Sequence, residues 1–207
     1  MTAALERRLA QTRATLGEEH DETLAAMLDL AEALWREGRL GAARGLEERV
    51  VAVRRRRLGA THPDTLKALG KLAVTLGMQG HLAQARALQE DIVAAMRALY
   101  GEGHRETLRA LNNLGGTIAA EGDLAAARAL LETVVAALCE SVGAADPDAL
   151  AAMGNLAAVL WREGACEEAY ALQLAVVEER RRAAAQDAVA TAAAEAALAA
   201  MERGVWQ

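Results

Sequence analysis

Aromatic residues are scarce in this sequence. They make up 2% of the 207 residues and phenylalanine does not occur, although 53% of the residues are hydrophobic. Alanine and leucine must therefore fill the interior. Such side chains suit closely packed helices and suit a β-sandwich badly, because strands favour β-branched and aromatic residues.

Proline and cysteine are also rare. Pro63 and Pro147 are the only prolines, and both fall where the repeat described below predicts a helix start, a position that tolerates proline. Cys139 and Cys166 are the only cysteines, which excludes a disulfide framework and gives no zinc-ligand spacing. We expect both to be small buried side chains in a reducing, cytoplasmic environment.

Basic charge and long apolar runs are the remaining shortages. The formal net charge is −6, which does not favour general nucleic-acid binding. No segment approaches the roughly 18 apolar residues of a membrane span, and residues 1–8 lack the apolar core of a secretory signal. We therefore expect neither a nucleic-acid nor a membrane partner.

The sequence does contain a nine-residue motif that recurs four times with a period of 42 residues. Its copies are LGEEHDETL, LGATHPDTL, YGEGHRETL and VGAADPDAL, which start at Leu16, Leu58, Tyr100 and Val142. A fixed period of this length is typical of a solenoid, in which each unit packs only against its neighbours.

Each period predicts a helical hairpin. The first helix has apolar residues at offsets of three, three and four, which place them on one face; in the first period they are Leu24, Met27, Leu30 and Leu34. One position beside them is always small: Ala31, Ala73, Gly115 and Ala157. The helix is expected to end at a C-capping glycine: Gly38, Gly80, Gly122 and Gly164. A second apolar helix follows, and stacking of the hairpins buries both faces.

The domain organisation follows from this period. We expect one domain over residues 1–207, with four repeats at 18–59, 60–101, 102–143 and 144–186. An N-terminal capping helix over 3–16 resembles a lone second helix. A C-terminal capping helix over 187–204 is rich in alanine and resembles a degraded first helix, stopped by Gly204.

The hairpin has small–Leu–small spacing, an E-G or Q-G turn and an alanine five residues later, and it resembles the tetratricopeptide repeat. The 42-residue period, the (H/D)-P-D-T-L opening and the L-N-N-L-G stretch from Leu111 to Gly115 resemble its kinesin-light-chain subtype, over about residues 16–182. The resemblance implies an all-α, right-handed superhelical solenoid. Its first helices would line a concave groove that holds an extended or short helical peptide.

By repeat position, the resemblance also assigns residues to this groove. The candidate peptide-binding residues are Lys67, Lys71, Arg109, Asn112, Asn113, Asn155, Trp161 and Arg162. Over all groove positions the cations outnumber the anions by three; they are Arg36, Lys67, Lys71, Arg109 and Arg162 against Asp29 and Glu32. We therefore expect a partner segment that carries carboxylates. The alternatives are that the cations are solvated helix charges and that Trp161 packs against the next hairpin.

The resemblance implies that asparagine holds the peptide backbone, a role that suits its amide because the amide both donates and accepts hydrogen bonds. In the resemblance, Asn113 and Asn155 occupy the position of that role. Asp29 and Lys71 stand there in repeats one and two, so the contact carries over only to the second half of the chain. Lys67 and Lys71 also resemble part of a chaperone-type carboxylate clamp, but Asp29 replaces the asparagine that the clamp needs.

Two other clusters have structural interpretations. His20, His62 and His104 are repeat-equivalent, but stacked helices lie about 8–10 Å apart, whereas bonds to one metal are about 2 Å long. We expect helix caps or solvent-exposed side chains instead, and Asp146 would take the capping role in repeat four. Arg54–Arg57 and Arg180–Arg182 are interpreted as complements to helix dipoles rather than as phosphate-binding surfaces.

No nucleophile elbow, phosphate-binding loop or zinc-protease motif occurs. We therefore predict a non-enzymatic protein–protein interaction module, without cofactor or metal, that binds an extended acidic peptide segment in its groove. The alternative is an architectural module. It would either self-associate as a homo-oligomer through the C-terminal helix or serve as the sensor region of a larger signalling regulator.

Overall fold

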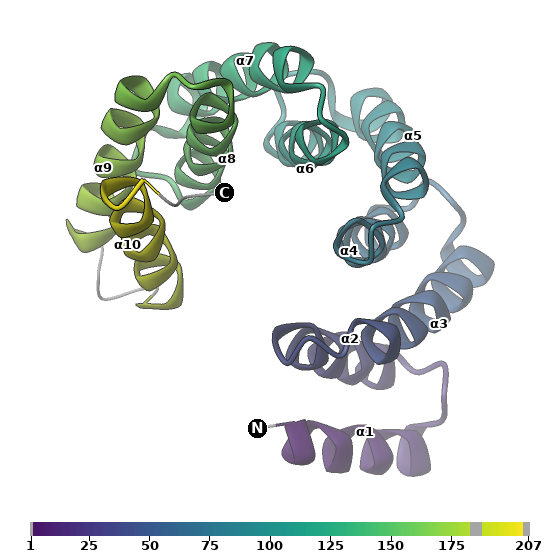
Figure 1. Cartoon of the computed structure of the whole chain (residues 1–207). Coiled ribbons are helices and arrows are strands. Elements are labelled where there is room, and N and C mark those ends of the chain that lie inside the picture. The colour runs from purple at the N-terminus through teal and green to yellow at the C-terminus, as the bar shows by residue number, and fades with distance from the viewer. Residues whose placement is uncertain (1, 183–187, 205–207) are drawn as a thin grey trace. The chain divides into compact units, whose positions relative to one another are not determined.

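The repeated apolar face determines where helices form, and the computed structural model of the chain is built from helices at these positions (Figure 1). The structure describes residues 2–182 and 188–204, and these form ten α-helices and no strand. The helices are α1 (Thr2–Leu16), α2 (Asp21–Arg36), α3 (Leu40–Leu58), α4 (Pro63–Met78), α5 (Leu82–Tyr100), α6 (Arg105–Glu121), α7 (Leu124–Val142), α8 (Pro147–Glu163), α9 (Cys166–Arg182) and α10 (Ala188–Glu202). Residues 183–187, which include the expected start of the last helix, lie outside the described residues.

The chain divides into two compact units, of which the first ends at Ala95 and the second begins at Met96, within α5. In the first unit, α1 packs on α2, α2 on α3 and α3 on α4. In the second unit, the helices from α6 to α10 pack in chain order, and α6 also contacts α8. The first helices of repeats three and four therefore touch directly. That the whole chain is one domain stays a prediction.

Histidine side chains cap three of the first helices. The Nδ1 atoms of His20, His62 and His104 each accept a hydrogen bond of 3.2 Å from the backbone N–H two residues further on. Asp146 accepts the equivalent bond at 2.9 Å in α8, and the Tyr100 ring stacks on His104 with 4.5 Å between centroids. The predicted capping role is confirmed.

The equivalence of histidine and aspartate caps gives a first prediction. His62→Ala should lower the free energy of unfolding by about 1 kcal/mol, because one N–H at the start of α4 loses its acceptor. His62→Asp should keep the wild-type stability, since it recreates the Asp-Pro-Asp start that α8 already has. Urea unfolding followed by far-UV circular dichroism measures both, and an equal loss in the two variants would contradict the capping role.

The glycine that ends each first helix adopts a positive φ. Gly122 and Gly164 are the C-caps of α6 and α8, with φ of 99° and 88°. In the first two repeats the glycine follows the cap by one residue, and Gly38 and Gly80 have φ of 74° and 82°. The predicted stop is confirmed, because this conformation strains any residue with a Cβ.

The predicted apolar face of the first helices is buried. In α2, Leu24 and Met27 are each 1% exposed. The equivalent residues of the other first helices are buried as well: Leu66, Leu69, Leu72, Leu76, Leu108, Leu111, Leu114, Ile118, Leu150, Met153, Leu156 and Leu160. The period therefore identifies the core correctly.

The small position of the first helix faces the second helix of the same repeat. A Cβ on Gly115 would lie 2.8 Å from both Cγ and Cδ2 of Leu131, and Leu131 is fully buried. Leucine thus fills the space that a side chain on Gly115 would need. The other three repeats have alanine at the small position, and the residues equivalent to Leu131 are polar and buried there: Glu47, Gln89 and Gln173.

Glu47 is the ionisable member of this set. It is 4% exposed, and its Oε2 has no hydrogen-bond partner within the described residues. Burial raises the pKa of its carboxyl group above 4.5, while the Thr75 hydroxyl and the charge of Lys71 oppose the shift. In repeat four the neutral Gln173 amide instead donates to the Ala194 carbonyl at 2.9 Å.

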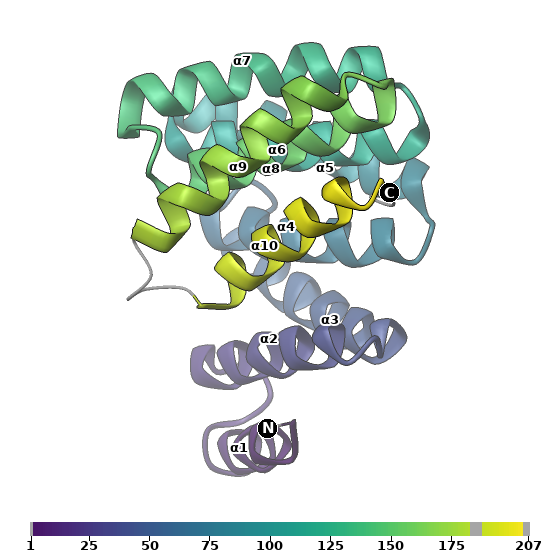
Figure 2. The same ribbon diagram turned by 60° about the vertical axis from the view of Figure 1, so that its left-hand side comes forward.

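The C-terminal helix α10 lies along α9 in the second unit (Figure 2). Its buried Ala194 belongs to an apolar cluster with residues of α8 and α9: Leu150, Met153, Val176 and Val177. Helix α10 therefore covers apolar side chains of the fourth hairpin that a further repeat would otherwise cover.

The expectation that both cysteines are buried is wrong for Cys166. This residue is exposed at the first position of α9, whereas Cys139 is half-buried in α7. The first turn of a second helix precedes the positions that pack on the neighbouring helix, which begin at Ala169.

Candidate functional site

The exposed side of α4 is the first candidate surface. Lys67, Lys71, Val74 and Met78, at offsets of four, three and four, are all exposed; we call these four residues the α4 face. Val74 and Met78 are 38% and 60% exposed. Two lysines are therefore followed by two uncovered apolar side chains along one side of a helix whose other side is buried.

The two lysines of the α4 face differ in their surroundings. Lys71 Nζ lies 3.3 Å from Glu32 Oε2 on α2, and Glu32 Oε1 lies 2.7 Å from Arg36 Nη2. No such partner is found for Lys67 in the parts of the chain that are described. Because Lys71 and Glu32 are both half-exposed, their ion pair contributes roughly 0–1 kcal/mol.

A shallow, open depression lies beside Glu32, between α1 and α2. Its lining residues are Leu5, Asp29, Glu32, Ala33 and Arg36. Asp29 lies 2.7 Å from Arg8 of α1. Both carboxylates in the depression are thus already paired with arginines.

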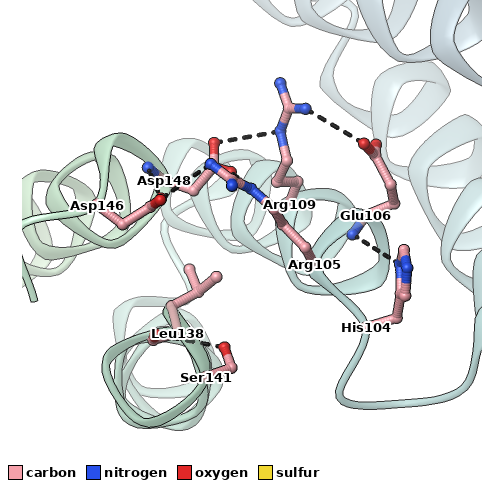
Figure 3. Close-up of polar contacts among 8 residues, drawn as sticks. All are labelled: His104, Arg105, Glu106, Arg109, Leu138, Ser141, Asp146 and Asp148. Carbon is pink, nitrogen blue, oxygen red and sulfur yellow. Dashed lines mark hydrogen bonds and ion pairs between the residues drawn. The ribbon is translucent and has the colours of Figure 1, made fainter. Parts of the chain in front are cut away.

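In the second unit, Arg109 belongs to a group of ion pairs between α6 and α8 (Figure 3). Its Nε lies 3.3 Å from Asp148, and its Nη1 lies 3.5 Å from Glu106. Arg105, one turn earlier, hydrogen-bonds to Asp148 and lies 3.0 Å from Asp146. The hydrogen bond to Asp148 raises the pKa of Arg105. These carboxylates lie outside the groove positions counted from the sequence, and they offset part of the expected positive charge.

Two of the candidate asparagines bind each other. Asn155 Nδ2 donates to Asn112 Oδ1 at 3.0 Å, which joins α8 to α6. Both are half-buried, and Asn113 is exposed. The bond leaves the Asn112 amide N–H groups and Asn155 Oδ1 with capacity for a further donor and acceptor.

Arg162 and Trp161 complete the candidates. Arg162 Nη1 donates at 2.7 Å to the Ala119 carbonyl in the last turn of α6, and the same carbonyl accepts from the Gly122 backbone N–H at 3.0 Å. Trp161 is half-buried, while its repeat equivalent Trp35 is 36% exposed. Arg162 therefore has a structural contact that the sequence did not predict.

The structure gathers the candidates into two sets. Lys67 and Lys71 lie on α4 in the first unit. The second unit holds the others on two contacting helices, with Arg109, Asn112 and Asn113 on α6 and Asn155, Trp161 and Arg162 on α8.

Three arginines of the run Arg54–Arg57 contact the starts of α2 and α4 and the turn before α2. Arg54 donates to the Asp64 carbonyl at 2.8 Å, and Arg57 lies 2.9 Å from Asp21. Arg56 pairs with Glu19. The run thus ties the end of α3 to two copies of the nine-residue motif, contacts that the helix-dipole interpretation did not include.

Among residues 2–182 and 188–204, no helix is long and apolar enough to cross a membrane. The same residues contain no group of three or more side chains that could hold a metal ion.

The tetratricopeptide repeat model matches three adjoining segments of the chain, residues 23–64, 65–106 and 107–148. These segments cover more than half of the sequence and share the period of the nine-residue motif. Among curated proteins, none matches the chain.

Several solved structures are similar to this chain. One is a crystal structure of nearly identical TPR-like repeats of a kinesin light chain from Podosopora anserina. Its sequence is 29% identical to that of this chain, and the two structures match with a TM-score of 0.64 over 88% of this chain and 86% of that one. BtubC from P. vanneervenii is 16% identical with a TM-score of 0.72, over 100% and 84% of the two chains. A Rap protein complexed with Competence and Sporulation Factor is 13% identical with a TM-score of 0.71, over 97% of this chain and 59% of that one. The last two likenesses concern the fold alone.

Proposed function

Because this chain belongs to the tetratricopeptide repeat family, we propose that it is a non-enzymatic, cytoplasmic interaction module that binds an extended acidic segment of a protein partner. The resemblance to kinesin-light-chain repeats supports a protein partner for the exposed sides of the first helices. The acidic character of the segment rests on the residues of this chain.

The observation that carries the proposal is the α4 face. Both lysines of the chain lie on it, beside the exposed Val74 and Met78. Lysine ammonium groups bind carboxylates as point charges, and uncovered apolar side chains gain free energy when a partner removes them from water. A partner segment that carries both acidic and apolar residues fits this surface.

The second unit adds groups that suit a peptide backbone. Asn113 is exposed, and the Asn112–Asn155 pair retains donor and acceptor capacity. We assign the backbone contacts to these three residues. Arg109, Trp161 and Arg162 are assigned to flanking contacts, with Arg109 and Arg162 also held by protein groups.

Self-association through the C-terminal helix is the alternative. Helix α10 already packs on α9 through its buried side, so a homo-oligomer would have to use its remaining surface. The residues of the α4 face are exposed and none of them is buried against another helix. We therefore favour peptide binding. The same contacts would serve a sensor region within a larger regulator.

The test is a double charge reversal on the α4 face. Lys67→Glu with Lys71→Glu should weaken binding of the fluorescein-labelled peptide Glu-Glu-Leu-Glu-Glu-Leu-Glu-Glu by about tenfold or more, because attraction becomes repulsion. Fluorescence anisotropy gives the dissociation constant, and circular dichroism should show an unchanged fold. The loss should shrink as salt is added, since exposed charges are screened.

The control keeps the net charge change and moves it elsewhere. Arg44→Glu with Arg97→Glu reverses two surface arginines, the half-buried Arg44 on α3 and the exposed Arg97 on α5, and should change the dissociation constant much less. An unchanged affinity in the lysine variant, or an equal loss in the control, would contradict the proposed site.

A further inference from the structure

Glu32 forms an ion pair with Lys71, one of the two lysines that the proposed function assigns to the partner. Its two carboxylate oxygens divide between two cations, with Oε1 at 2.7 Å from Arg36 and Oε2 at 3.3 Å from Lys71. The contact to Lys71 joins α2 to α4 within the first unit. A carboxylate of this chain thus stands where a carboxylate of the partner would bind.

We propose that Glu32 competes with the partner for Lys71 and thereby lowers the affinity of the α4 face for an extended segment that presents two carboxylates at alternate residues. This inference rests on the proposed function. It adds a residue that sets the affinity for the partner, Glu32, and a sequence pattern for the partner, acidic–x–acidic.

The spacing of the two lysines supports this pattern. Lys67 and Lys71 are four residues apart on α4, which is about 6 Å along a helix axis. Alternate residues of an extended peptide point to the same side and lie about 6.6 Å apart. Two carboxylates at such positions match the two lysines.

The two lysines then differ in what binding requires. A first carboxylate can bind Lys67 without displacing another side chain, because no partner of Lys67 is found in the described chain. A second carboxylate must displace Glu32 from Lys71, after which Glu32 keeps Arg36. A segment with one acidic residue gains nothing from Lys71, because Glu32 already neutralises it.

Glu32→Gln tests the competition, since it removes the charge and keeps the shape. The probes are the labelled peptides Gln-Leu-Glu-Leu-Glu-Leu-Gln and Gln-Leu-Glu-Leu-Gln-Leu-Gln, which differ by one carboxylate. Glu32→Gln should tighten binding of the first about two- to fivefold, the range of one exposed ion pair. Binding of the second should change by much less.

Two further variants separate local competition from general charge. Asp29→Asn removes the same charge from the same helix, but Asp29 is paired with Arg8, so the gain should be smaller. In a Lys71→Gln background, Glu32→Gln should give no gain. Equal gains for both probes, or for Asp29→Asn, would overturn the competition.

The outcome is separable from that of the proposed function. If the double lysine reversal weakens binding and Glu32→Gln does not tighten it, the α4 face stands and the competition by Glu32 falls. If the double lysine reversal leaves binding unchanged, the proposed site itself falls.

Discussion

Gly115→Ala should lower the free energy of unfolding by about 1–2 kcal/mol, whereas Gly116→Ala should raise it by about 0.5–1 kcal/mol. The two residues are neighbours in α6, and the chemical change is the same. Alanine is favoured over glycine in a helix by up to about 1 kcal/mol, and this gain applies to both variants.

The opposite signs come from the space around each Cβ. At Gly116 no atom lies within 4 Å of the new methyl group, whereas at Gly115 two atoms of Leu131 lie 2.8 Å away. Leu131 is fully buried, so it cannot move without disturbing its own neighbours. Overpacking of this kind costs about 1–3 kcal/mol, which exceeds the gain in helix propensity.

The remaining repeats supply a rescue. Adding Leu131→Gln to Gly115→Ala recreates the pairs Ala73–Gln89 and Ala157–Gln173. The loss of unfolding free energy in the double variant should therefore be smaller than the sum of the losses in the two single variants. We expect a difference of about 0.5–3 kcal/mol, the range for contacting residues. Urea denaturation of the four proteins measures this coupling. Additive losses, or equal shifts at Gly115 and Gly116, would show that the contact with Leu131 does not require glycine.

Glu47→Gln should stabilise the protein by roughly 1–3 kcal/mol at pH 7, because it removes a buried charge that has an unpaired oxygen. Glutamine already fills the equivalent position in repeats two and four. The new amide also provides a donor of the kind that Gln173 uses toward Ala194. The Thr75 hydroxyl can still donate to the remaining oxygen.

The gain should depend on pH with a defined sign. The pKa of Glu47 is raised in the folded protein above its ordinary value of 4.5, so the folded state holds its proton to higher pH than the unfolded state does. Wild-type stability therefore falls as the pH rises through the folded-state pKa, and it is recovered on acidification. The advantage of Glu47→Gln should be largest at neutral pH and disappear by about pH 4.5.

Urea unfolding of both proteins at several pH values between 4 and 8 checks this expectation. Glu48→Gln is the matched control, because Glu48 is an exposed neighbour paired with Arg44, and its effect should be small throughout. A stability difference between wild type and Glu47→Gln that is constant with pH would contradict the assignment to Glu47.

The parts of the fold that repeat were predictable from the sequence. Apolar offsets identified buried residues such as Leu24, and a recurring glycine identified helix ends such as Gly122. The histidine caps followed from geometry, since repeat-equivalent residues on stacked helices are too far apart for one metal. Each of these inferences depends only on a position within a hairpin, and that position recurs four times.

The contacts between repeats were harder to predict, because they do not follow the period. Asn155 is equivalent to Asn113, yet it binds Asn112, and Arg105 binds Asp148; both pairs are 43 residues apart. The Lys71–Glu32 pair is separated by 39 residues. An alignment on 42 residues compares equivalent positions and therefore overlooks pairs that meet in space. A search for complementary side chains one residue or a few residues away from the period would have found them.

The charge of the candidate site illustrates the same limit. The count over groove positions included Arg109 but neither Glu106 nor Asp148. These two residues lie in the first turns of α6 and α8, and both form ion pairs with Arg109. A sequence count treats each cation as available, whereas the structure decides which cations already have a partner. Of the cations in the count, Lys67 is the one for which the described chain provides no contact.

The contacts between α6 and α8 fix the order of the third and fourth hairpins. Gly115 and Leu131 belong to one hairpin, so their contact would be kept if that hairpin were exchanged with another. The Arg105–Asp148 and Asn112–Asn155 contacts each take one residue from repeat three and one from repeat four. A shuffled array would keep every hairpin core and lose these matches at each new junction. The repeats are thus alike enough to share a fold, and repeat three is still specific for repeat four.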